Sequence, residues 1–372
     1  MEHAIKIHFD PGKTGPFYTA VSREVYQYFS TNKINPTGNI ALYTKTAILL
    51  SLFPILYVVW LYFHDYFWLS AVINFLLGMD FAGIGFCVMH DGNHGSYSTN
   101  KRVNKLMGLT LNLLGGINFF WVDKHNVKHH TYVNVEGKDE DISFGKAMRM
   151  SPEQPWYWWH RYQAYYVVVL YGIFYFGWIW LLDFIKYVKF CRDTYNPKMT
   201  FHAYFRKYGS KHANFWLTKI QYATIWFILP TILIGWQAML IGYLIRGVTC
   251  GIIISFVFQL AHVVSGTAFA VPDTQTGKLP DEFALHHLKS TSNFSRKNWF
   301  ATWYLGGLNY QIEHHIFPEI SHVHYSKISN IVKKVAMQFN EKYNEQPTFL
   351  SAIASHFRHL QTLGKKPKPA YA

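Results

Sequence analysis

Four long runs of apolar residues constrain the fold more than any other feature of the sequence. They cover 47–63, 67–89, 220–236 and 247–261, and Asp80 is the only charged residue among them. A helix of about 20 apolar residues crosses the hydrocarbon core of a bilayer, where the backbone must satisfy its own hydrogen bonds. The sequence therefore predicts an all-α integral membrane protein that crosses the bilayer several times.

Histidines gather in three short clusters, H-D-G-N-H at 90–94, H-N-V-K-H-H at 125–130 and Q-I-E-H-H at 311–315, and His262 ends the fourth apolar run. Residues four apart share a helix face. Imidazole ligands without thiolates suit a metal that changes its oxidation state when it reacts with oxygen, and iron is the natural choice. One tetrahedral zinc takes at most four protein ligands, so eight placed histidines imply two metal ions or a large surplus of ligands. The candidate ligands are His90, His94, His125, His129, His130, His262, His314 and His315.

The positions of the clusters also predict how often the chain crosses the membrane. Lys101, Arg102 and Lys105 follow the second apolar run, whereas the connection before it has no Lys or Arg, and basic loops stay in the cytoplasm. All clusters must lie on that side to share metals, so two further runs, 106–122 and 165–182, are predicted to be re-entrant or interfacial. The prediction is about four transmembrane helices and a cytoplasmic cap that carries the histidines. Arg246 is expected near the outer turn of the last helical pair.

No linker or repeat divides the 372 residues. We expect an amphipathic cytoplasmic segment at 1–45, a membrane and cap domain at 46–325 and a basic cytoplasmic tail at 326–372. The net charge of +14 is assigned to a surface that faces anionic lipid, since the sequence has no nucleic-acid-binding motif. A solvated, disordered end is an equal alternative for the basic stretch 365–369.

Two features bear on the cellular compartment. Residues 1–4 lack the basic and apolar regions of a signal peptide, and Cys87, Cys191 and Cys250 form neither a metal motif nor a disulfide framework. Both features fit a reducing compartment. A multi-pass protein of the bacterial inner membrane or the endoplasmic reticulum, with its site on the cytoplasmic face, is therefore expected.

In order and spacing, the three clusters resemble the histidine boxes of membrane fatty acid desaturases, over about residues 67–325. The third box begins with Gln311 where many members have His. With its flank G-G-L-N-Y at 306–310, it resembles the front-end group, which inserts a double bond between an existing one and the carboxyl end. The stretches 282–287 and 291–294 are similar to the region before that box in the same group. The resemblance implies a cis double bond formed in a CoA- or lipid-linked fatty acyl chain, with O2 as co-substrate and two iron ions.

The resemblance implies iron ligation by the eight histidines. Gln311 occupies a further ligand position, although an amide is a weaker donor than imidazole. Asp80, inside the second apolar run, is predicted to make an interhelical hydrogen bond or to line the substrate channel. His287 and Asn293 are assigned to that channel, with ligation as the alternative for His287.

Other polar residues near the clusters receive ordinary roles. Asp139, Glu140 and Asp141 follow the second cluster and are expected to be solvated. His322 and His324 follow the third cluster in a polar segment and are expected at the surface.

Many front-end members carry a fused cytochrome b5 domain with a His-Pro-Gly-Gly haem motif, which this sequence lacks. Electrons are therefore expected from a separate carrier, a cytochrome b5 or a ferredoxin with its reductase. A fatty acyl or lipid hydroxylase with the same di-iron site is the alternative enzyme. A metal transporter would need ligands near the membrane midplane, whereas these clusters lie at the ends of the predicted helices.

Overall fold

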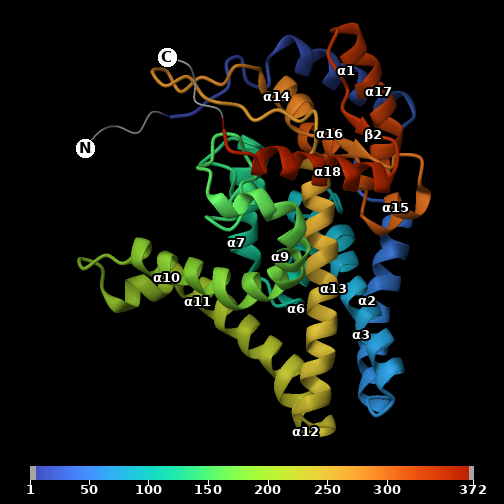
Figure 1. The fold of residues 1–372 in the computed structure, drawn as a ribbon, viewed down its shortest axis with the longest axis vertical. Helices are drawn as coiled ribbons and strands as arrows, with labels where there is room; N and C mark the ends of the chain where they lie inside the picture. The colour runs from blue at the N-terminus through green and yellow to red at the C-terminus, as the bar shows by residue number, and fades with distance from the viewer. Residues whose placement is uncertain (1–5, 368–372) are drawn as a thin grey trace.

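The computed structural model describes residues 6–367, which fold into a bundle of long helices beneath a cap of shorter ones (Figure 1). The prediction about a signal peptide and the last two residues of the basic stretch 365–369 lie outside the described residues. The long bundle contains α2 (Ile40–Tyr62), α3 (Phe67–Ile84), η1 (Gly85–Met89), α4 (His90–His94), η6 (Thr224–Ile228), α12 (Leu229–Ile234) and α13 (Trp236–His262).

The bundle is antiparallel, so that two of its helices end together in the cap. A tight turn at 64–66 joins α2 to α3, and Gly235, with a φ of +82°, joins α12 to α13 at the same far end. The helices α3 and α13 touch closely, since a Cβ on Gly78 would lie 2.6 Å from the carbonyl oxygen of Arg246. Both run toward the cap, which brings His94 and His262 to one end of the molecule (Figure 1).

Arg246 lies well inside α13 and not near the outer turn, so that expectation was wrong. Its side chain is fully buried, donates a hydrogen bond of 2.9 Å to the Asn74 side-chain oxygen and lies 3.9 Å from the ring of Trp226. An aromatic face and a neutral amide can shelter a guanidinium in an apolar setting. The aromatic residue that does so is far away in the sequence, so the sequence alone did not place Arg246 inside the helix.

The interrupted run 106–122 turns back on itself, as predicted. Its helices are α5 (Lys101–Gly108), α6 (Thr110–Leu113), α7 (Asn118–Val122), η2 (Asp123–His129) and α8 (His130–Tyr132), with a bend of 107° at the break after Leu113. Lys219 donates a 2.8 Å hydrogen bond to the carbonyl oxygen of Gly115 at this break. Because His94 and His130, before and after the segment, lie within 4.6 Å ring to ring, the segment returns to the side it left.

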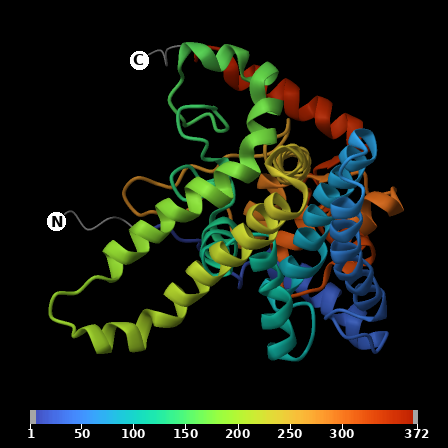
Figure 2. The same ribbon diagram turned by 90° about the horizontal axis from the view of Figure 1, so that it is seen from below.

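A second excursion leaves the bundle sideways. It consists of α9 (Gln163–Gly177), η5 (Trp178–Leu182), α10 (Asp183–Thr194) and α11 (Phe201–Ala223), and Figure 2 shows α10 and α11 as a projecting pair.

Five helices in the described part of the chain are long and apolar enough to cross a membrane, one more than the four predicted. The additional one is Trp158–Thr194. Both ends of its apolar part, 165–182, lie next to residues that contact the cap, since Gln163 donates to the Leu360 carbonyl at 2.9 Å and Lys186 pairs with Glu140 at 3.0 Å. These contacts favour an embedded helix that does not cross, which stays a prediction.

The cap assembles from both ends of the chain, from the connection between α8 and α9 and from the connection between α13 and α17. Its elements are α1 (Pro16–Thr31), η3 (Glu140–Ile142), η4 (Trp158–Tyr162), α14 (Phe283–Ser290), α15 (Trp299–Tyr304), α16 (Gln311–Ile316), η7 (His322–His324), α17 (Tyr325–Gln338) and α18 (Phe349–Gly364), with β1 (Asn293–Phe294) parallel to β2 (Glu345–Gln346). The apolar face of α1, including Phe17 and Val21, packs on α14 and α17. The region predicted as a tail thus contains two packed helices, α17 and α18.

A buried ion pair fixes the base of the projecting pair. Lys219 and Asp183 are 4% and 1% exposed and lie 2.7 Å apart. Removing one partner of a buried pair strands the other charge and costs about 3–5 kcal/mol. Lys219→Met should therefore lower the thermal unfolding midpoint in detergent clearly, and Lys219→Met with Asp183→Leu should recover much of the loss. Lys189→Met is the exposed control. A Lys219→Met protein as stable as this control would contradict the prediction.

Candidate metal centre

The eight predicted ligands meet where α4, η2, α8, α13 and α16 converge. Within each group described next, the donor atoms lie within 4.8 Å of one another. One group contains His90, His94, His125 and His314, and another contains His129, His262 and His315. His130 joins His314 and His315 between them. Two adjacent groups of this composition match the prediction of two metal positions.

A local widening of the helix brings the second cluster into place. Residues 123–129 form a π-helical turn, η2, instead of the ordinary α-helix expected from the sequence. Such turns have an i, i+5 repeat and occur often at functional sites. Here the widening places the Nε2 atoms of His125 and His130, five residues apart, 3.2 Å from each other.

The ring nitrogens are arranged to receive cations. Both ring nitrogens of His262 and His315, and one each of His94, His129, His130 and His314, are buried without a hydrogen-bond partner among the described residues. Leaving buried polar atoms unsatisfied is costly, and a bound metal ion removes that cost. The residues therefore fit a metal centre held almost wholly by imidazole.

Burial also holds the two imidazoles of the third cluster, His314 and His315, in the state that binds metal. It lowers the pKa of His314 and of His315 well below the usual 6.5, and the neighbouring histidines lower it further. A histidine must be neutral to donate a lone pair to a metal ion. The cap thus presents its third cluster ready for ligation at neutral pH.

Residues outside the groups fix the orientation of two rings. The Nδ1 of His129 lies 3.0 Å from Asp139 Oδ1, and the Nδ1 of His314 lies 3.1 Å from the hydroxyl of Tyr325. Each contact leaves Nε2 pointing into the cluster, the usual arrangement around metal-bound histidine. Asp139 is 2% exposed, so the expectation that it is merely solvated was wrong.

The other two residues of that acidic loop are also paired. Asp141 lies 3.4 Å from His129 and pairs with Lys124, and Glu140 pairs with Lys128 and Lys186. The basic partners come from η2 and α10, which the sequence alone does not place beside this loop.

His322 and His324 are buried, so their predicted surface position was wrong. His322 Nδ1 lies 3.0 Å from Asp91 Oδ2, and its Nε2 lies 2.9 Å from Lys45 Nζ. His324 Nε2 lies 3.1 Å from the Thr37 carbonyl oxygen. Both rings tie the segment after the third cluster to distant parts of the chain, and His322 supports the aspartate next to His90.

Gln311 is buried on the first turn of α16, and its side-chain nitrogen has no partner among the described residues. Next to it on the helix, Glu313 accepts hydrogen bonds of 2.8 Å each from Asn293 and Tyr343. Burial raises the pKa of Glu313 to about 7, against the effect of these two donors. Asn293 therefore anchors α16.

A cavity of about 520 Å³ opens beside the histidines. Four charged residues of its lining, Lys124, Glu140, Asp141 and Lys186, are partly exposed and mark its mouth, and aromatic side chains line much of the rest. Trp121, Trp178, Ile254 and Phe258 also line a narrower apolar pocket, which His90, Tyr175 and Cys250 line as well. The two adjoining cavities form a passage beside His90 and His125 of the first group of histidines.

None of the three residues assigned to a substrate channel lines this passage. His287 is buried, its ring centroid 5.3 Å from that of His315, and neither ring nitrogen has a partner among the described residues. Asp80 is buried in α3, and neither carboxylate oxygen has a hydrogen-bond partner among the described residues, so the predicted interhelical hydrogen bond is not formed. Asn293 donates a hydrogen bond to Glu313. Their assignment to a substrate channel stays a prediction, while α7, η5 and α13 supply the residues that line both cavities.

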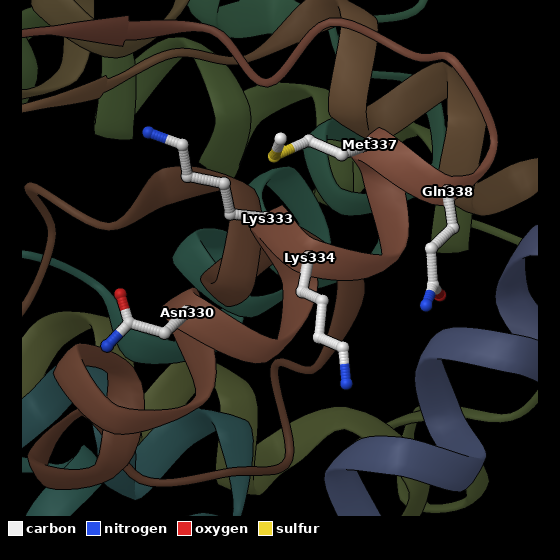
Figure 3. A pocket seen from close by; sticks show the side chains of 5 residues that line it. All are labelled: Asn330, Lys333, Lys334, Met337 and Gln338. Carbon is white, nitrogen blue, oxygen red and sulfur yellow. The ribbon is translucent and has the colours of Figure 1, made fainter.

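A separate hollow lies on the outer side of α17. Figure 3 shows its lining side chains, Asn330, Lys333, Lys334, Met337 and Gln338, all from α17. It contains no candidate metal ligand and is not part of the passage.

The sequence model for "Fatty acid desaturase" matches residues 66–347. An "sn-1 linoleoyl-lipid 6-desaturase" of Synechocystis sp. is 34% identical over 358 residues, which cover 94% of this chain and 96% of that protein. A protein of the same name from Arthrospira platensis is 32% identical, with 96% and 95% covered. An "Acyl-lipid (8-3)-desaturase" of Physcomitrium patens is 36% identical, with 94% and 72% covered.

The role of Asp139 can be tested by its charge. Asp139→Asn keeps the size of the side chain but removes the carboxylate that orients His129. Losing such a partner typically weakens metal affinity about 10–100-fold. Metal retained after mild chelation, measured by mass spectrometry, should fall toward half of the wild-type content. Glu140→Gln, which pairs only with lysines, should retain the wild-type content. Equal retention in both variants would contradict this role.

The buried neutral histidines also predict a pH dependence. Since the pKa values of His314 and His315 lie well below 6.5 in the folded state, the unfolded chain takes up more protons as the pH falls below about 6.5. The metal-free protein should therefore lose thermal stability between about pH 7.5 and 5.5. The variant His314→Asn with His315→Asn should show a shallower loss. A midpoint independent of pH would contradict the neutral state.

Proposed function

The chain belongs to the fatty acid desaturase family, and from that premise we propose that it is a front-end desaturase of lipid-linked acyl chains. The curated relatives described above are named as acyl-lipid 6- and (8-3)-desaturases. The single observation that carries the proposal is the passage lined by His90 and His125 of the first group of buried imidazoles, with the second group adjacent to the first. A methylene chain in that passage lies next to the metal positions.

We assign the two metals as iron, held by the eight histidines with Gln311 at the edge of the set. When bound, the iron pair supplies the activation of O2 and the removal of two hydrogens from neighbouring carbons. Six of the eight histidines have a buried ring nitrogen without a partner among the described residues, and His90 and His125 face each other through their Nε2 atoms at 3.2 Å. Imidazole is a common ligand of iron. Asp139 and Tyr325 keep two of the rings turned toward the centre.

The protein's own contribution is to hold the chain and keep water away. Trp121, Trp178 and Phe258 line both parts of the passage, so the acyl chain is held among rigid aromatic rings where the two cavities join. A dry, fixed setting positions one pair of carbons and protects the reaction from water. The charged mouth keeps the polar end of the substrate outside, since Lys124 and Lys186 are already paired with carboxylates.

The reaction also needs two electrons, for which we propose a separate acidic carrier, a cytochrome b5 or a ferredoxin with its reductase. Exposed lysines of the cap, such as Lys327, Lys334 and Lys342, offer the complementary charge that speeds such encounters. We place this cap, and the metal centre beneath it, on the cytoplasmic face of a multi-pass membrane protein.

The decisive test is the fatty acid profile of a host that expresses the chain and is fed mono- and di-unsaturated acids. Gas chromatography–mass spectrometry should show a new acid lighter by two hydrogen atoms, with its new double bond nearer the carboxyl end. The product should disappear in His129→Ala with His130→Ala. A product heavier by one oxygen atom would instead establish a hydroxylase. No product, even with a donor and its reductase co-expressed, would contradict the proposal.

A further inference from the structure

The projecting pair of helices, which we call the α10–α11 hairpin (residues 183–223), carries much of the positive charge of the protein. It has eight Lys or Arg and two Asp, a net charge of +6 out of +14 for the whole chain. Both aspartates face a basic neighbour, Asp183 next to Lys219 at 2.7 Å and Asp193 next to Arg192 at 3.2 Å. The basic residues are Lys186, Lys189, Arg192, Lys198, Arg206, Lys207, Lys211 and Lys219.

The same hairpin exposes large apolar side chains. Val188 on α10 is 67% exposed, and Phe201, Trp216 and Leu217 on α11 are 78%, 48% and 65% exposed. At 100° per residue, Phe205 and Trp216 share one side of α11, Lys207 lies on the opposite side, and Arg206 lies beside Leu217. Basic residues interspersed with exposed aromatic and aliphatic ones suit the membrane interface, where acyl chains and phosphates are both within reach.

The two helices of the hairpin pack on each other through a layer of aromatic side chains, so the exposed side chains are not needed to hold the hairpin together. The rings of Tyr187 and Phe215 stack with centroids 3.9 Å apart, and Phe190 meets Tyr208 at 5.9 Å. Lys219 fixes the base through Asp183. The two helices are therefore a rigid projection whose outer residues must meet something other than this chain.

The position of the hairpin points to the head-group layer. One helical stretch, Phe201–Ile234, contains α11 and is long enough to cross a bilayer. The hydrocarbon core needs about 20 residues, which counted back from Ile234 reach Phe215. The remaining first half of α11 then lies beyond the core. At the base of the hairpin, Asp183 and the partly exposed Lys186 line the cavity beside the histidines, so the base of the hairpin lies next to that cavity.

We propose that the outer part of the α10–α11 hairpin, residues 186–214, lies in the head-group layer and binds anionic phospholipid, with 215–223 entering the hydrocarbon core. Its apolar residues insert among the acyl chains, and its lysines and arginines contact the phosphates. An acidic protein partner fits less well, because the basic residues alternate with exposed Val188, Trp216 and Leu217. Lipid would cover these apolar side chains, whereas docking to an acidic protein through charge would not require them. The inference concerns membrane contact and does not depend on the reaction catalysed.

The chain offers a natural reporter for this contact. Cys191 lies on α10 and is half-buried, whereas Cys87 and Cys250 are fully buried, so a thiol-reactive fluorophore labels Cys191 selectively. The labelled full-length protein is reconstituted into vesicles of phosphatidylcholine and phosphatidylglycerol in which one lipid at a time carries brominated chains. Brominated phosphatidylglycerol should quench the label about twofold or more better than brominated phosphatidylcholine at equal fraction. High salt should remove the difference.

Two matched variants separate specific from general charge effects. Lys189→Gln with Arg206→Gln and Lys207→Gln should abolish the preference for the anionic lipid. The same loss of three charges on the cap, Lys327→Gln with Lys334→Gln and Lys342→Gln, should leave it unchanged; Figure 3 shows Lys334 projecting from α17.

Three results would overturn the proposal. They are equal quenching by both lipids, the same change in both variants, and no quenching by either lipid. The last would make the hairpin a surface for a soluble acidic partner. Because quenching needs no turnover, a failure of the desaturase proposal would not affect this result.

Discussion

The structure depends on a cluster of buried imidazoles, six of which have a ring nitrogen without a hydrogen-bond partner among the described residues. Such a cluster is unfavourable by itself, because each buried nitrogen has lost its contact with water. It becomes stable only when cations occupy the spaces between the rings. Four separate parts of the chain end at this point, so the bundle, the re-entrant segment and the cap are all held in relation to the metal positions. We expect metal binding and the final packing of the cap to be closely coupled.

Much of this arrangement could be predicted from the sequence, because it follows from the spacing of the histidines and from the number of times that the chain can cross the membrane between them. The three clusters and His262 indicate one shared site, and a shared site requires that they lie on one side. That argument alone predicts that residues 106–122 turn back, and they do. The wall of the passage was not predictable in the same way. Its residues come from α7, η5 and α13, and their side chains meet only through tertiary packing.

The errors concern polar residues whose partners are distant in the sequence. Asp139 and His322 look like ordinary loop residues, yet each is buried against a ring or an acid from the centre. Arg246 looks like a boundary charge, but Trp226 and Asn74 shelter it. The π-helical turn η2 could not be predicted either, because a repeat of 3.6 residues predicts an ordinary α-helix. A carboxylate adjacent to a histidine cluster, as at 139–141, was the one available signal for an outer set of supporting residues.

The apolar interior and the membrane interface place opposite requirements on the protein, and the mouth of the cavity joins the two. The interior beneath the histidines must be dry and apolar to hold a hydrocarbon chain, whereas a substrate anchored to a lipid keeps its head group at the interface. Lys124 and Lys186 stand at the mouth already neutralised by Asp141 and Glu140, so the mouth offers little net charge. A head group with many negative charges, such as coenzyme A, gains little there, while a glycerolipid can leave its head outside and insert only its chain. This charge balance favours lipid-linked substrates independently of any sequence similarity.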